Sequence, residues 1–497
     1  MIQTSDFFLT LRTAGSQETP KLAGQSKDMT SQMRFVEPNK RVRLGQRKLI
    51  RIKRTQDLIE SFAWATLVFV TAMFLIDGGV EGITDPATLW NSVGRLTALL
   101  ATDLLLIHML LIARVPWIDR LYGHDRATLT HKKLGKPVLY LVIAHFLASA
   151  INYVMTDGKT IIAALLELIF KVQDMLIATA SLVLMILVVV TSLNFARRKL
   201  SYEAWYIVHL MSYAAVLLAV PHQFSTGADI AGKPLQTLFW VSLYLFVALN
   251  IIGFRVLAPI FESLYFRFKV QAINRESHDS TSIYLTGRNF QKLGVKAGQF
   301  YILRVLTARE WWRAHPFSIS AAPNSSFVRF TVGNRGDDTA LLQNIKPGTP
   351  VILEGPYGVF TEDRRTRERV TLIAAGIGAP PIRSLAESMA ARPGDIDVIY
   401  RVRTEADAPL AAELAELCRR RGFGFHLLEG KRGNANSWMP DDGTNRPDHA
   451  RLSQITPWVS ESDVYICGPA AWTHTVVRSL RKSGTPENQI HAEEFAW

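Results

Sequence analysis

The sequence predicts a multi-domain membrane protein: a six-helix transmembrane bundle, then an antiparallel β-barrel domain, then an α/β domain with a parallel sheet. Its 497 residues are 48% hydrophobic and 20% charged, which excludes a disordered chain or a coiled coil. The long apolar runs lie between Ile59 and Leu257, whereas the part after Arg267 has the composition of a soluble enzyme. Because Cys418 and Cys467 are the only cysteines, a disulfide scaffold, a cysteine zinc site and a four-thiolate iron–sulfur cluster are excluded.

Six apolar stretches are each close to the roughly 20 residues that a helix needs to cross a bilayer. They cover residues 58–76, 93–113, 134–155, 175–195, 204–223 and 235–257. The segments between them alternate between rich and poor in Lys and Arg, starting with a first connector that has none. A soluble bundle of six buried helices would not show this alternation. We therefore expect a multi-pass protein of the cell membrane with both termini in the cytoplasm.

The positive charge is concentrated beside the first span. The formal net charge is +13, and residues 34–54 hold nine Lys or Arg against one acid, Glu37. Basic residues next to an apolar run indicate a membrane surface, so we expect no nucleic-acid partner. Residues 1–33 lack periodicity and are predicted to be a disordered tail. Residues 1–57 thus form a disordered and then basic cytoplasmic segment, and residues 58–260 form the bundle.

The pattern changes after residue 260. Short alternating segments at 268–273, 282–286, 301–305 and 327–332 are typical of antiparallel strands, and predict a barrel over residues 261–366. From residue 370 the pattern predicts a strand at 370–375, a glycine turn and a helix at 381–391. A strand at 397–400 and a helix at 410–420 follow, with a later strand at 464–467. This order predicts a parallel α/β sheet over residues 367–497.

Four histidines lie within or at the ends of the third and fifth spans, where imidazole is costly and marks a function by default. His131 and His145 are 14 residues apart, about four helical turns, and so face one side at two depths. His209 and His222 are 13 apart and need a kink or bulge, which Pro221 could supply. Two such helices could hold two iron porphyrins, each ligated from both sides. His108 and His124 lack such partners; we interpret them as a packing residue and a loop residue.

A first group of motifs, in the barrel region, fits a flavin. In a strand that contains His315-Pro316-Phe317-Ser318, Phe317 and Ile319 would face one way and the serines the other. A flavin needs an apolar wall for its ring and polar donors for its edge and phosphates. A glycine turn before a short helix offers a site for the pyrophosphate. Plain turns explain each motif alone, but their order indicates a flavin site at His315, Pro316, Phe317, Ser318, Ile319, Ser320, Gly336, Thr339 and Gly355.

A second group, at the carboxyl ends of the parallel strands, fits a nicotinamide dinucleotide. A glycine turn and a helix start follow the strand at 370–375, and backbone at glycine can approach a pyrophosphate closely. Arg401 and Arg403 follow another strand and favour the 2′-phosphate of NADPH, although Glu405 nearby would suit NADH and the arginines could instead be solvated. Cys467 is either a wall against the nicotinamide or a buried thiol. The expected site is Gly376, Gly378, Pro380, Arg401, Arg403, Cys467, Gly468 and Pro469.

Together, these motifs and the paired histidines resemble the ferric reductase/NADPH oxidase superfamily, in particular a prokaryotic member, over residues 58–497. The resemblance implies FAD in the barrel, NAD(P)H in the α/β domain and two haem b groups in the bundle. It implies that a C-terminal aromatic residue covers the flavin; we favour Phe495, with Trp497 second. It also places Arg95 near the outer haem. The expected catalytic residues are therefore Arg95, Cys467 and Phe495. Ser149 stands where many family oxidases have a histidine, which argues against efficient superoxide production.

The sequence thus predicts an enzyme that passes electrons from cytoplasmic NAD(P)H through FAD and two haems to an external small-molecule acceptor. Oxygen is the first acceptor considered, giving superoxide or hydrogen peroxide. The alternatives are a ferric or cupric chelate reductase and an electron-supply subunit for a separate protein. Short outer loops argue against the last, and no obligate protein partner is evident. A channel or receptor with a relic nucleotide module is disfavoured because both motif sets are intact.

Overall fold

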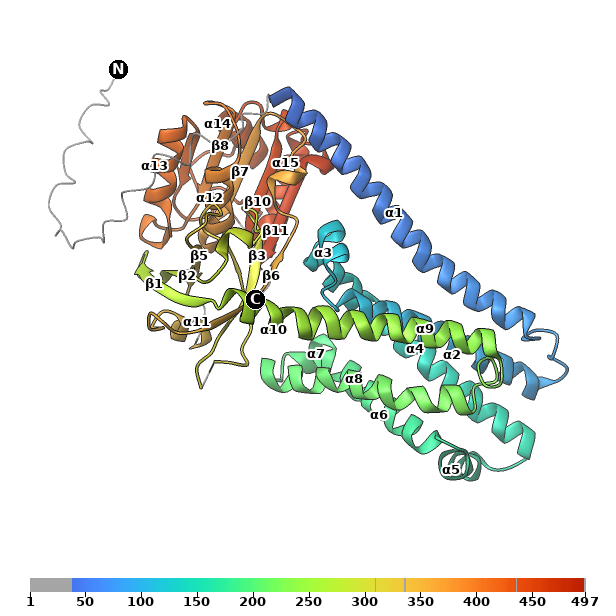
Figure 1. The fold of residues 1–497 in the computed structure, drawn as a ribbon. Coiled ribbons are helices and arrows are strands. Elements are labelled where there is room, and N and C mark those ends of the chain that lie inside the picture. The colour runs from blue at the N-terminus through green and yellow to red at the C-terminus, as the bar shows by residue number, and fades with distance from the viewer. Residues whose placement is uncertain (1–37, 309, 335–336, 435, 496–497) are drawn as a thin grey trace, which may run out of the picture.

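The computed structural model describes residues 38–308, 310–334, 337–434 and 436–495. The predicted tail at 1–33, and the predicted site residues Gly336 and Trp497, lie outside the described residues. In Figure 1 the helical bundle extends to one side of a compact body that contains the strands. The chain therefore has a helical half and a mixed α/β half, as the sequence predicts.

Six helical segments are long and apolar enough to cross a membrane. This confirms the number of predicted spans and indicates a multi-pass membrane protein. The spanning helices are α1 (Pro38–Ile76), α2 (Pro86–Leu111), α4 (His124–Asp157), α6 (Met175–Ser192), α8 (Tyr202–Ser225) and the continuous run of α9 (Pro234–Asn250), the π-helix η1 (Ile251–Leu257) and α10 (Ala258–Phe266).

Three features of the bundle differ from a simple set of spans and loops. The basic segment before the first span is helical from Pro38 and continues into the membrane as part of α1. The third connector contains its own helix, α5 (Ile161–Lys171), and short helices α3 (Pro116–Tyr122) and α7 (Asn194–Arg197) occupy the basic connectors. The last span changes to π geometry at η1 before α10 resumes.

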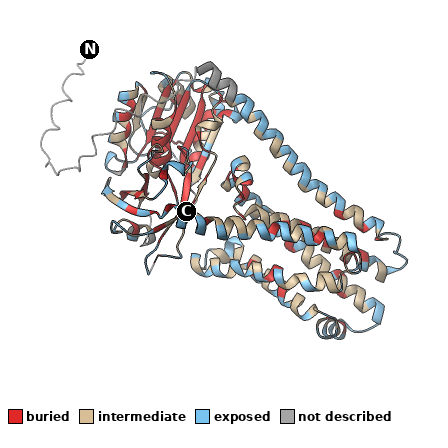
Figure 2. Ribbon diagram, in the orientation of Figure 1, coloured by how far each residue is buried: buried red, intermediate tan, exposed pale blue. Residues whose placement is uncertain are grey.

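Burial separates the two halves of the chain. Figure 2 shows buried residues concentrated in the strands of the compact body, whereas the bundle is mostly intermediate or exposed. In the six candidate spans only 6–28% of the most apolar window is buried inside the protein. A soluble helical bundle would bury an apolar stripe of each helix, so these exposed apolar surfaces fit a lipid environment.

The first strand-rich domain consists of two three-stranded antiparallel sheets. One has the order β1-β2-β5 and the other β4-β3-β6. Among the described residues, isolated bridges, Ile319 with Phe330 and Lys269 with Pro350, and a few backbone hydrogen bonds connect the sheets without a continuous ladder, so the predicted barrel is not closed. Pro316 shortens the available ladder in β4 because it has no N–H to donate. The strands are β1 (Lys269–Arg275), β2 (Ser280–Thr286), β3 (Phe300–Val305), β4 (His315–Ser318), β5 (Val328–Gly333) and β6 (Val351–Tyr357), and α11 (Asp337–Leu342) follows β5.

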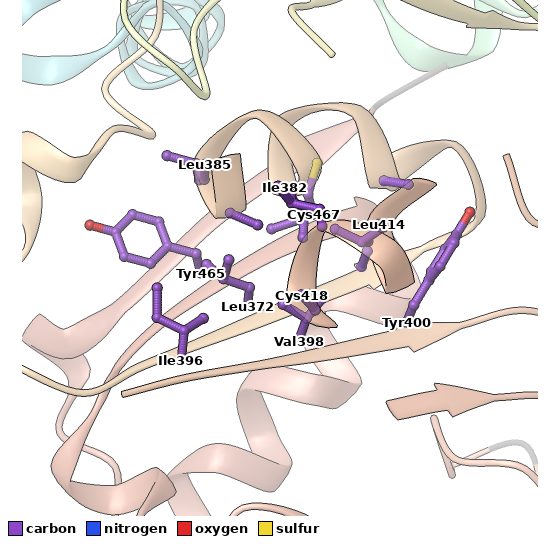
Figure 3. Close-up of a cluster of buried hydrophobic side chains, with 14 of the residues drawn as sticks. Leu372, Ile382, Leu385, Ile396, Val398, Tyr400, Leu414, Cys418, Tyr465 and Cys467 are labelled. Atoms are coloured by element: carbon purple, nitrogen blue, oxygen red, sulfur yellow. The ribbon is translucent and has the colours of Figure 1, made fainter. Parts of the chain in front are cut away.

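The second domain is built on the predicted parallel sheet, in the order β11-β10-β7-β8-β9. A buried cluster on one face joins the sheet to α12 and α13, and Figure 3 shows Cys418 and Cys467 within it. The two thiols are free, which agrees with the exclusion of a disulfide scaffold. The elements are β7 (Val370–Ala375), α12 (Ala379–Ser388), β8 (Ile396–Arg401), α13 (Ala411–Arg421), β9 (Gly424–Leu428), α14 (Asp448–Ile455), β10 (Asp463–Pro469), α15 (Ala470–Lys482) and β11 (Ile490–Phe495).

A buried cluster of charges joins the bundle to the β-sheet domain. Glu354 of β6 is 4% exposed and pairs with both Arg304 of β3 and Arg114, which follows α2. Arg114 has φ 60°, a left-handed conformation that is uncommon for a residue other than glycine. Beside this pair, the ring of His124 stacks on Tyr357 at 5.3 Å between centroids. The start of α4 is therefore held directly against the domain that precedes the parallel sheet.

Replacing Glu354 with Ala should destabilise this joint. The substitution leaves two partly buried guanidinium groups without a compensating charge, and breaking a buried pair in this way costs about 3–5 kcal/mol. Thermal or denaturant unfolding of the purified protein measures the change. Glu416→Ala is a matched control, because its pair with Arg419 is exposed and worth about 1 kcal/mol or less. Equal effects of the two substitutions would contradict a structural role for Glu354.

Candidate functional site

The histidines of α4 are held by backbone carbonyls of α2. Nδ1 of His131 lies 3.0 Å from the carbonyl oxygen of His108, and Nδ1 of His145 lies 2.9 Å from that of Gly94. A carbonyl only accepts, so each Nδ1 carries the proton and each Nε2 keeps a free lone pair. This is the usual arrangement of a metal-ligating histidine, in which the second nitrogen donates to a backbone carbonyl.

His209 of α8 is oriented in the same way by a hydroxyl group. Its Nδ1 lies 3.2 Å from Ser192 Oγ, and that hydroxyl donates its own proton to the carbonyl of Val188. Ser192 therefore accepts from His209, whose Nε2 is left as the acceptor. The indole of Trp205 stacks on the imidazole at 5.0 Å. In three of the four predicted ligand histidines, Nδ1 therefore donates a hydrogen bond and Nε2 keeps a lone pair that could bind a metal.

His222 is the exception, since its buried Nδ1 has no hydrogen-bond partner. The expected bulge at Pro221 is absent: α8 stays α-helical from Tyr202 to Ser225, with Pro221 inside it. His222 nonetheless lies within electrostatic range of His145. A buried imidazole nitrogen without a hydrogen bond to a described residue leaves room for a further group.

The inner pair fits a bis-imidazole metal site. The ring centroids of His131 and His209 are 6.1 Å apart. An iron about 2 Å from one nitrogen of each ring would separate the ring centres by roughly 6 Å. His108 stacks on His131 at 3.7 Å, which agrees with its interpretation as a packing residue. No group of three or more metal-ligating side chains occurs in the described part of the chain.

Arg95 lies at the other end of α2 and is locked in an ion pair. Its Nε donates to Asp229 Oδ2 at 2.9 Å, its Nη2 pairs with Asp229 Oδ1, and its guanidinium lies 5.3 Å from the Phe74 ring centre. Asp229 is only 4% exposed. Gly94, whose carbonyl holds His145, lies beside Ser149. Arg95 is therefore near the outer histidine level, but its positive charge is neutralised.

The predicted flavin motif lies on β4 and the residues after it. Phe317 and Ile319 are buried as expected, but Ser318 and Ser320 are buried as well. Ser318 Oγ donates to Glu493 Oε1 at 3.2 Å, and Ser320 Oγ accepts from Arg329. Both hydroxyls therefore form hydrogen bonds within the protein instead of pointing into an open site. His315 is partly buried and Pro316 exposed; Thr339 is partly buried on α11 and Gly355 has φ +140° at the end of the same sheet.

Glu493 is a residue that the sequence analysis missed. Its carboxyl group is 7% exposed, and burial, reinforced by nearby Asp125, raises its pKa to about 8. The hydrogen bond from Ser318 opposes the shift only in part. Burial likewise raises the pKa of the Cys467 thiol well above its usual range, so Cys467 is a neutral, buried thiol and no nucleophile. The pattern Glu493-Glu494 before Phe495 gave no signal, because only the fold brings β11 beside β4.

A cavity of about 910 Å³ lies at the carboxyl ends of the parallel strands, as predicted for the dinucleotide site. It brings together four predicted residues, Gly376, Arg401, Arg403 and Pro469. Gly333 and Asn334 of the other domain line its far side, so the cavity spans both domains. Its remaining charged lining comes from Asp279, Lys431 and Arg432.

Other predicted residues of this site act in packing. A Cβ on Gly378 would collide with the carbonyl oxygen of Cys467, and one on Gly468 would lie 2.7 Å from the Trp472 ring. Pro380 is buried in the first turn of α12. Glycine here lets the turn after β7 press against β10, which is one of its roles in dinucleotide folds. The structure describes Phe495 only as the last residue of β11 and not its side chain, so the predicted stacking of its ring on the flavin stays a prediction.

The two predicted phosphate-binding arginines differ in availability. Arg401 is 7% exposed and donates to the carbonyls of Val402, Leu428, Gly430 and Trp438. It therefore holds the β9 loop and has little left for a phosphate. Arg403 is exposed, and Lys431 and Arg432 from that loop join it in the cavity. Glu405 does not line the cavity.

The comparisons with known proteins match both halves of the chain. Residues 97–220 match the family "Ferric reductase like transmembrane component", and residues 372–478 match "Oxidoreductase NAD-binding domain". An NADPH oxidoreductase of Mycobacterium tuberculosis is 24% identical over 48% of this chain and 62% of its own length. NADH oxidoreductase HCR of Escherichia coli is 32% identical over 44% of this chain and 65% of its own. A flavohemoprotein of Vibrio cholerae is 26% identical over 41% of this chain and 52% of its own length. The chain thus spans about half to two thirds of these relatives.

Among solved structures, the FAD/NAD-binding domain of nitric oxide dioxygenase from Vibrio cholerae matches with a TM-score of 0.38 at 24% identity, over 46% of this chain and 98% of that one. A flavohemoglobin from Malassezia yamatoensis matches with a TM-score of 0.42 at 17% identity, and the match covers 84% of this chain and 100% of that one. The family matches show that the chain joins a ferric reductase-like transmembrane domain to an oxidoreductase NAD-binding domain. This fusion matches the ferric reductase/NADPH oxidase superfamily, as the sequence motifs indicate.

Gly378→Ala should weaken binding of the nicotinamide nucleotide. The new methyl group meets backbone of β10, so the turn that borders the cavity must move. We expect the KM for NAD(P)H to rise by at least tenfold, since small misplacements at such sites are costly. Gly433→Ala is the control, because its Cβ meets only ordinary contacts from 3.6 Å outward. Unchanged nucleotide binding in Gly378→Ala would contradict the assignment.

Glu493 should make stability depend on pH. Its folded pKa of about 8 exceeds the ordinary value of 4.5, so between these values the folded state holds a proton that the unfolded chain has lost. The group's contribution is complete below about pH 4.5 and falls as pH rises towards 8. Unfolding midpoints of wild type and Glu493→Gln across pH 5–8 measure this, and we expect a shallower slope in the variant. Parallel profiles would contradict the raised pKa; the exposed Glu461→Gln serves as control.

Proposed function

We propose that the protein passes electrons from cytoplasmic NAD(P)H, through FAD and two b-type haems, to an acceptor on the outer side of the cell membrane. One observation carries the proposal: the ring centroids of His131 and His209 lie 6.1 Å apart with their planes at 70°, and the Nδ1 atom of each ring is engaged in another hydrogen bond. His131 and His209 would hold the inner haem, and His145 and His222 the outer one. The orphaned Nδ1 of His222 supports the outer site only indirectly, through its need for a partner group.

The cofactors supply the redox chemistry: FAD accepts a hydride and releases single electrons, which haem iron can carry one at a time. The chain supplies placement. The cavity at Gly376 and Arg403 would hold the nucleotide, whereas Cys467 lies in the buried core behind it. Glu493, bonded to Ser318, keeps a proton on its carboxyl up to about pH 8 and can give or take the proton that accompanies hydride transfer.

Helix α4 carries one histidine of each proposed haem site and so relates the two sites along the proposed electron-transfer path. His131 and His145 lie 14 residues apart on it, about 21 Å along the axis, so the two ligand levels are at different depths. The cytoplasmic module packs against the end of α4 that is nearer to His131. The alternation of basic connectors supports the same orientation, with both termini in the cytoplasm.

The acceptor is proposed to be a small molecule. Oxygen is the first candidate from the family resemblance. The Arg95–Asp229 pair favours the second, a ferric or cupric chelate, because a neutralised arginine offers little attraction to a forming superoxide anion. Cytochrome c reduction by the purified protein with NADPH, measured with and without superoxide dismutase and a ferric chelate, distinguishes the two. Turnover that needs a further protein would instead support an electron-supply subunit.

His145→Ala should remove one of two haems and leave flavin reduction intact. The outer pair loses one of its two ligands, whereas the nucleotide cavity lies in a different domain. Haem per chain, from the pyridine haemochrome spectrum, should fall from two to about one. Anaerobic flavin bleaching by NADPH should keep its wild-type rate. Purified wild-type protein without any haem spectrum would refute the proposed function; His474→Ala, on an exposed helix, is the control.

Arg403→Ala should raise the KM for NADPH much more than that for NADH. Guanidinium pairs well with a 2′-phosphate, and Arg403 is the exposed arginine that follows β8 in the cavity. Because charge-assisted contacts contribute roughly 1.5–3 kcal/mol, we expect about a tenfold effect or more. Arg419→Ala, outside the cavity, controls for loss of surface charge. Equal changes with both nucleotides would show that Arg403 does not read the 2′-phosphate.

A further inference from the structure

The π-helix η1 places one arginine at the cytoplasmic end of the bundle. η1 interrupts the last span over Ile251–Leu257, and π segments inside helices frequently mark functional sites. Ile251 and Phe254 pack against the junction of α2 with α3. Arg255 points to the same junction, because its Nη1 donates to the carbonyl of Ile112 at 2.9 Å. The altered geometry thus turns a charged residue towards the interior of the bundle.

Arg255 has no carboxylate partner among the described residues. Glu262, two turns further along the same helix, forms no ion pair with it, and Glu354 is already paired with Arg114 and Arg304. Arg304 lies within range of Arg255, whose charge adds to burial in lowering the pKa of Arg304. Arg255 is thus a positive charge without an ion pair to a described carboxylate, although Asp119 and Glu262 lie within range of the neighbouring Tyr357. Such a charge at a membrane boundary is costly unless an anion compensates it.

The same arginine lies beside the inner histidine pair. Both His131 and His209 are within electrostatic range of its charge. Tyr357, on the sheet that packs against the bundle, is also within range. The unpaired charge is therefore between the inner metal site and the domain that faces it, rather than on the open surface.

We propose that Arg255 binds the propionate carboxylates of the inner haem. The inference rests on the proposed function, since it requires a haem between His131 and His209. A haem b would carry two propionate carboxylates, either of which could compensate the charge of Arg255. Arginine pairs with carboxylate through two parallel hydrogen bonds, and Arg255 keeps its remaining N–H groups available after donating once to Ile112. Flavin phosphates are the other anion with suitable chemistry.

The test compares full-length wild type with Arg255→Gln and Arg255→Lys. Glutamine can still donate to the Ile112 carbonyl but has no charge, whereas lysine keeps the charge without the planar fork. Arg267→Gln is the matched control, since Arg267 is an exposed arginine that ends the same helical run. Haem and FAD per chain are measured by absorbance and fluorescence, with the haem midpoint potentials as an additional readout.

We expect two haems per chain in wild type and the control, about one in Arg255→Gln, and an intermediate value in Arg255→Lys, with FAD unchanged in all. Two haems with unchanged potentials in Arg255→Gln would overturn the inference, and so would loss of FAD with haem retained. An absence of haem from wild type would instead overturn the proposed function. The two failures are therefore distinguishable.

A second measurement avoids dependence on how well a variant accumulates haem in the cell. Full-length protein produced under haem limitation is titrated with haemin and with haemin dimethyl ester, which lacks the free carboxylates. We expect wild type to bind the inner haemin roughly tenfold more tightly than the ester, because one charge-assisted pair is lost. Arg255→Gln should bind both equally. Equal binding by wild type, or the same preference in the variant, would overturn the inference.

Discussion

The direction of the imidazole rings in the bundle depends on hydrogen bonds that fix their Nδ1 atoms. In a low-dielectric interior a neutral imidazole must satisfy its one N–H, and here the carbonyls of His108 and Gly94 and the hydroxyl of Ser192 accept it. Each bond leaves Nε2 as the ring nitrogen with a free lone pair. The packing of α2 against α4 therefore determines the ligand geometry as much as the histidines do. His222, which lacks such a partner, is the least constrained of the four.

The joint at the cytoplasmic end connects this geometry to the nucleotide-binding module. Helix α4 begins at His124, whose ring stacks on Tyr357, and reaches His131 seven residues later, about two turns or 10 Å. Arg114, Glu354 and Arg304 hold the two parts in one arrangement. The start of α4 and this charged cluster are thus part of the joint between the two halves, together with the contact of α10 with β6 and the Lys48–Asp363 ion pair.

The spans and the parallel sheet could be predicted from the sequence because each depends on local pattern. Uninterrupted apolar runs of about 20 residues defined the spans, and the strand at 370–375 is β7 without change. Helix α5 was missed because the third connector was treated as a loop, although it contains an apolar run of its own. The bulge considered at Pro221 is absent, and π geometry occurs instead over Ile251–Leu257, where Gly253 and the following Pro259 gave a signal that the sequence analysis did not use.

Side-chain roles were predicted less well because they depend on partners distant in sequence. Arg401 was expected at a phosphate, but loop carbonyls from residues 428–438 take its donors. Ser318 was expected to face a cofactor, but Glu493, 175 residues away, accepts its hydroxyl proton. His124 was interpreted as a loop residue and lies at the domain joint. The four membrane histidines could be found in advance because their cost in hydrocarbon is a property of the residue itself.

Electron transfer across the membrane is tested most directly in sealed vesicles. The holoprotein is reconstituted with its nucleotide-binding module outside, ferricyanide is trapped in the lumen, and NADPH, which does not cross lipid, is added outside under anaerobic conditions. The account predicts that luminal ferricyanide is reduced while the haem bands show turnover. Reduction only of ferricyanide added on the same side as NADPH would contradict it, because electrons would then leave from the flavin without crossing the bundle.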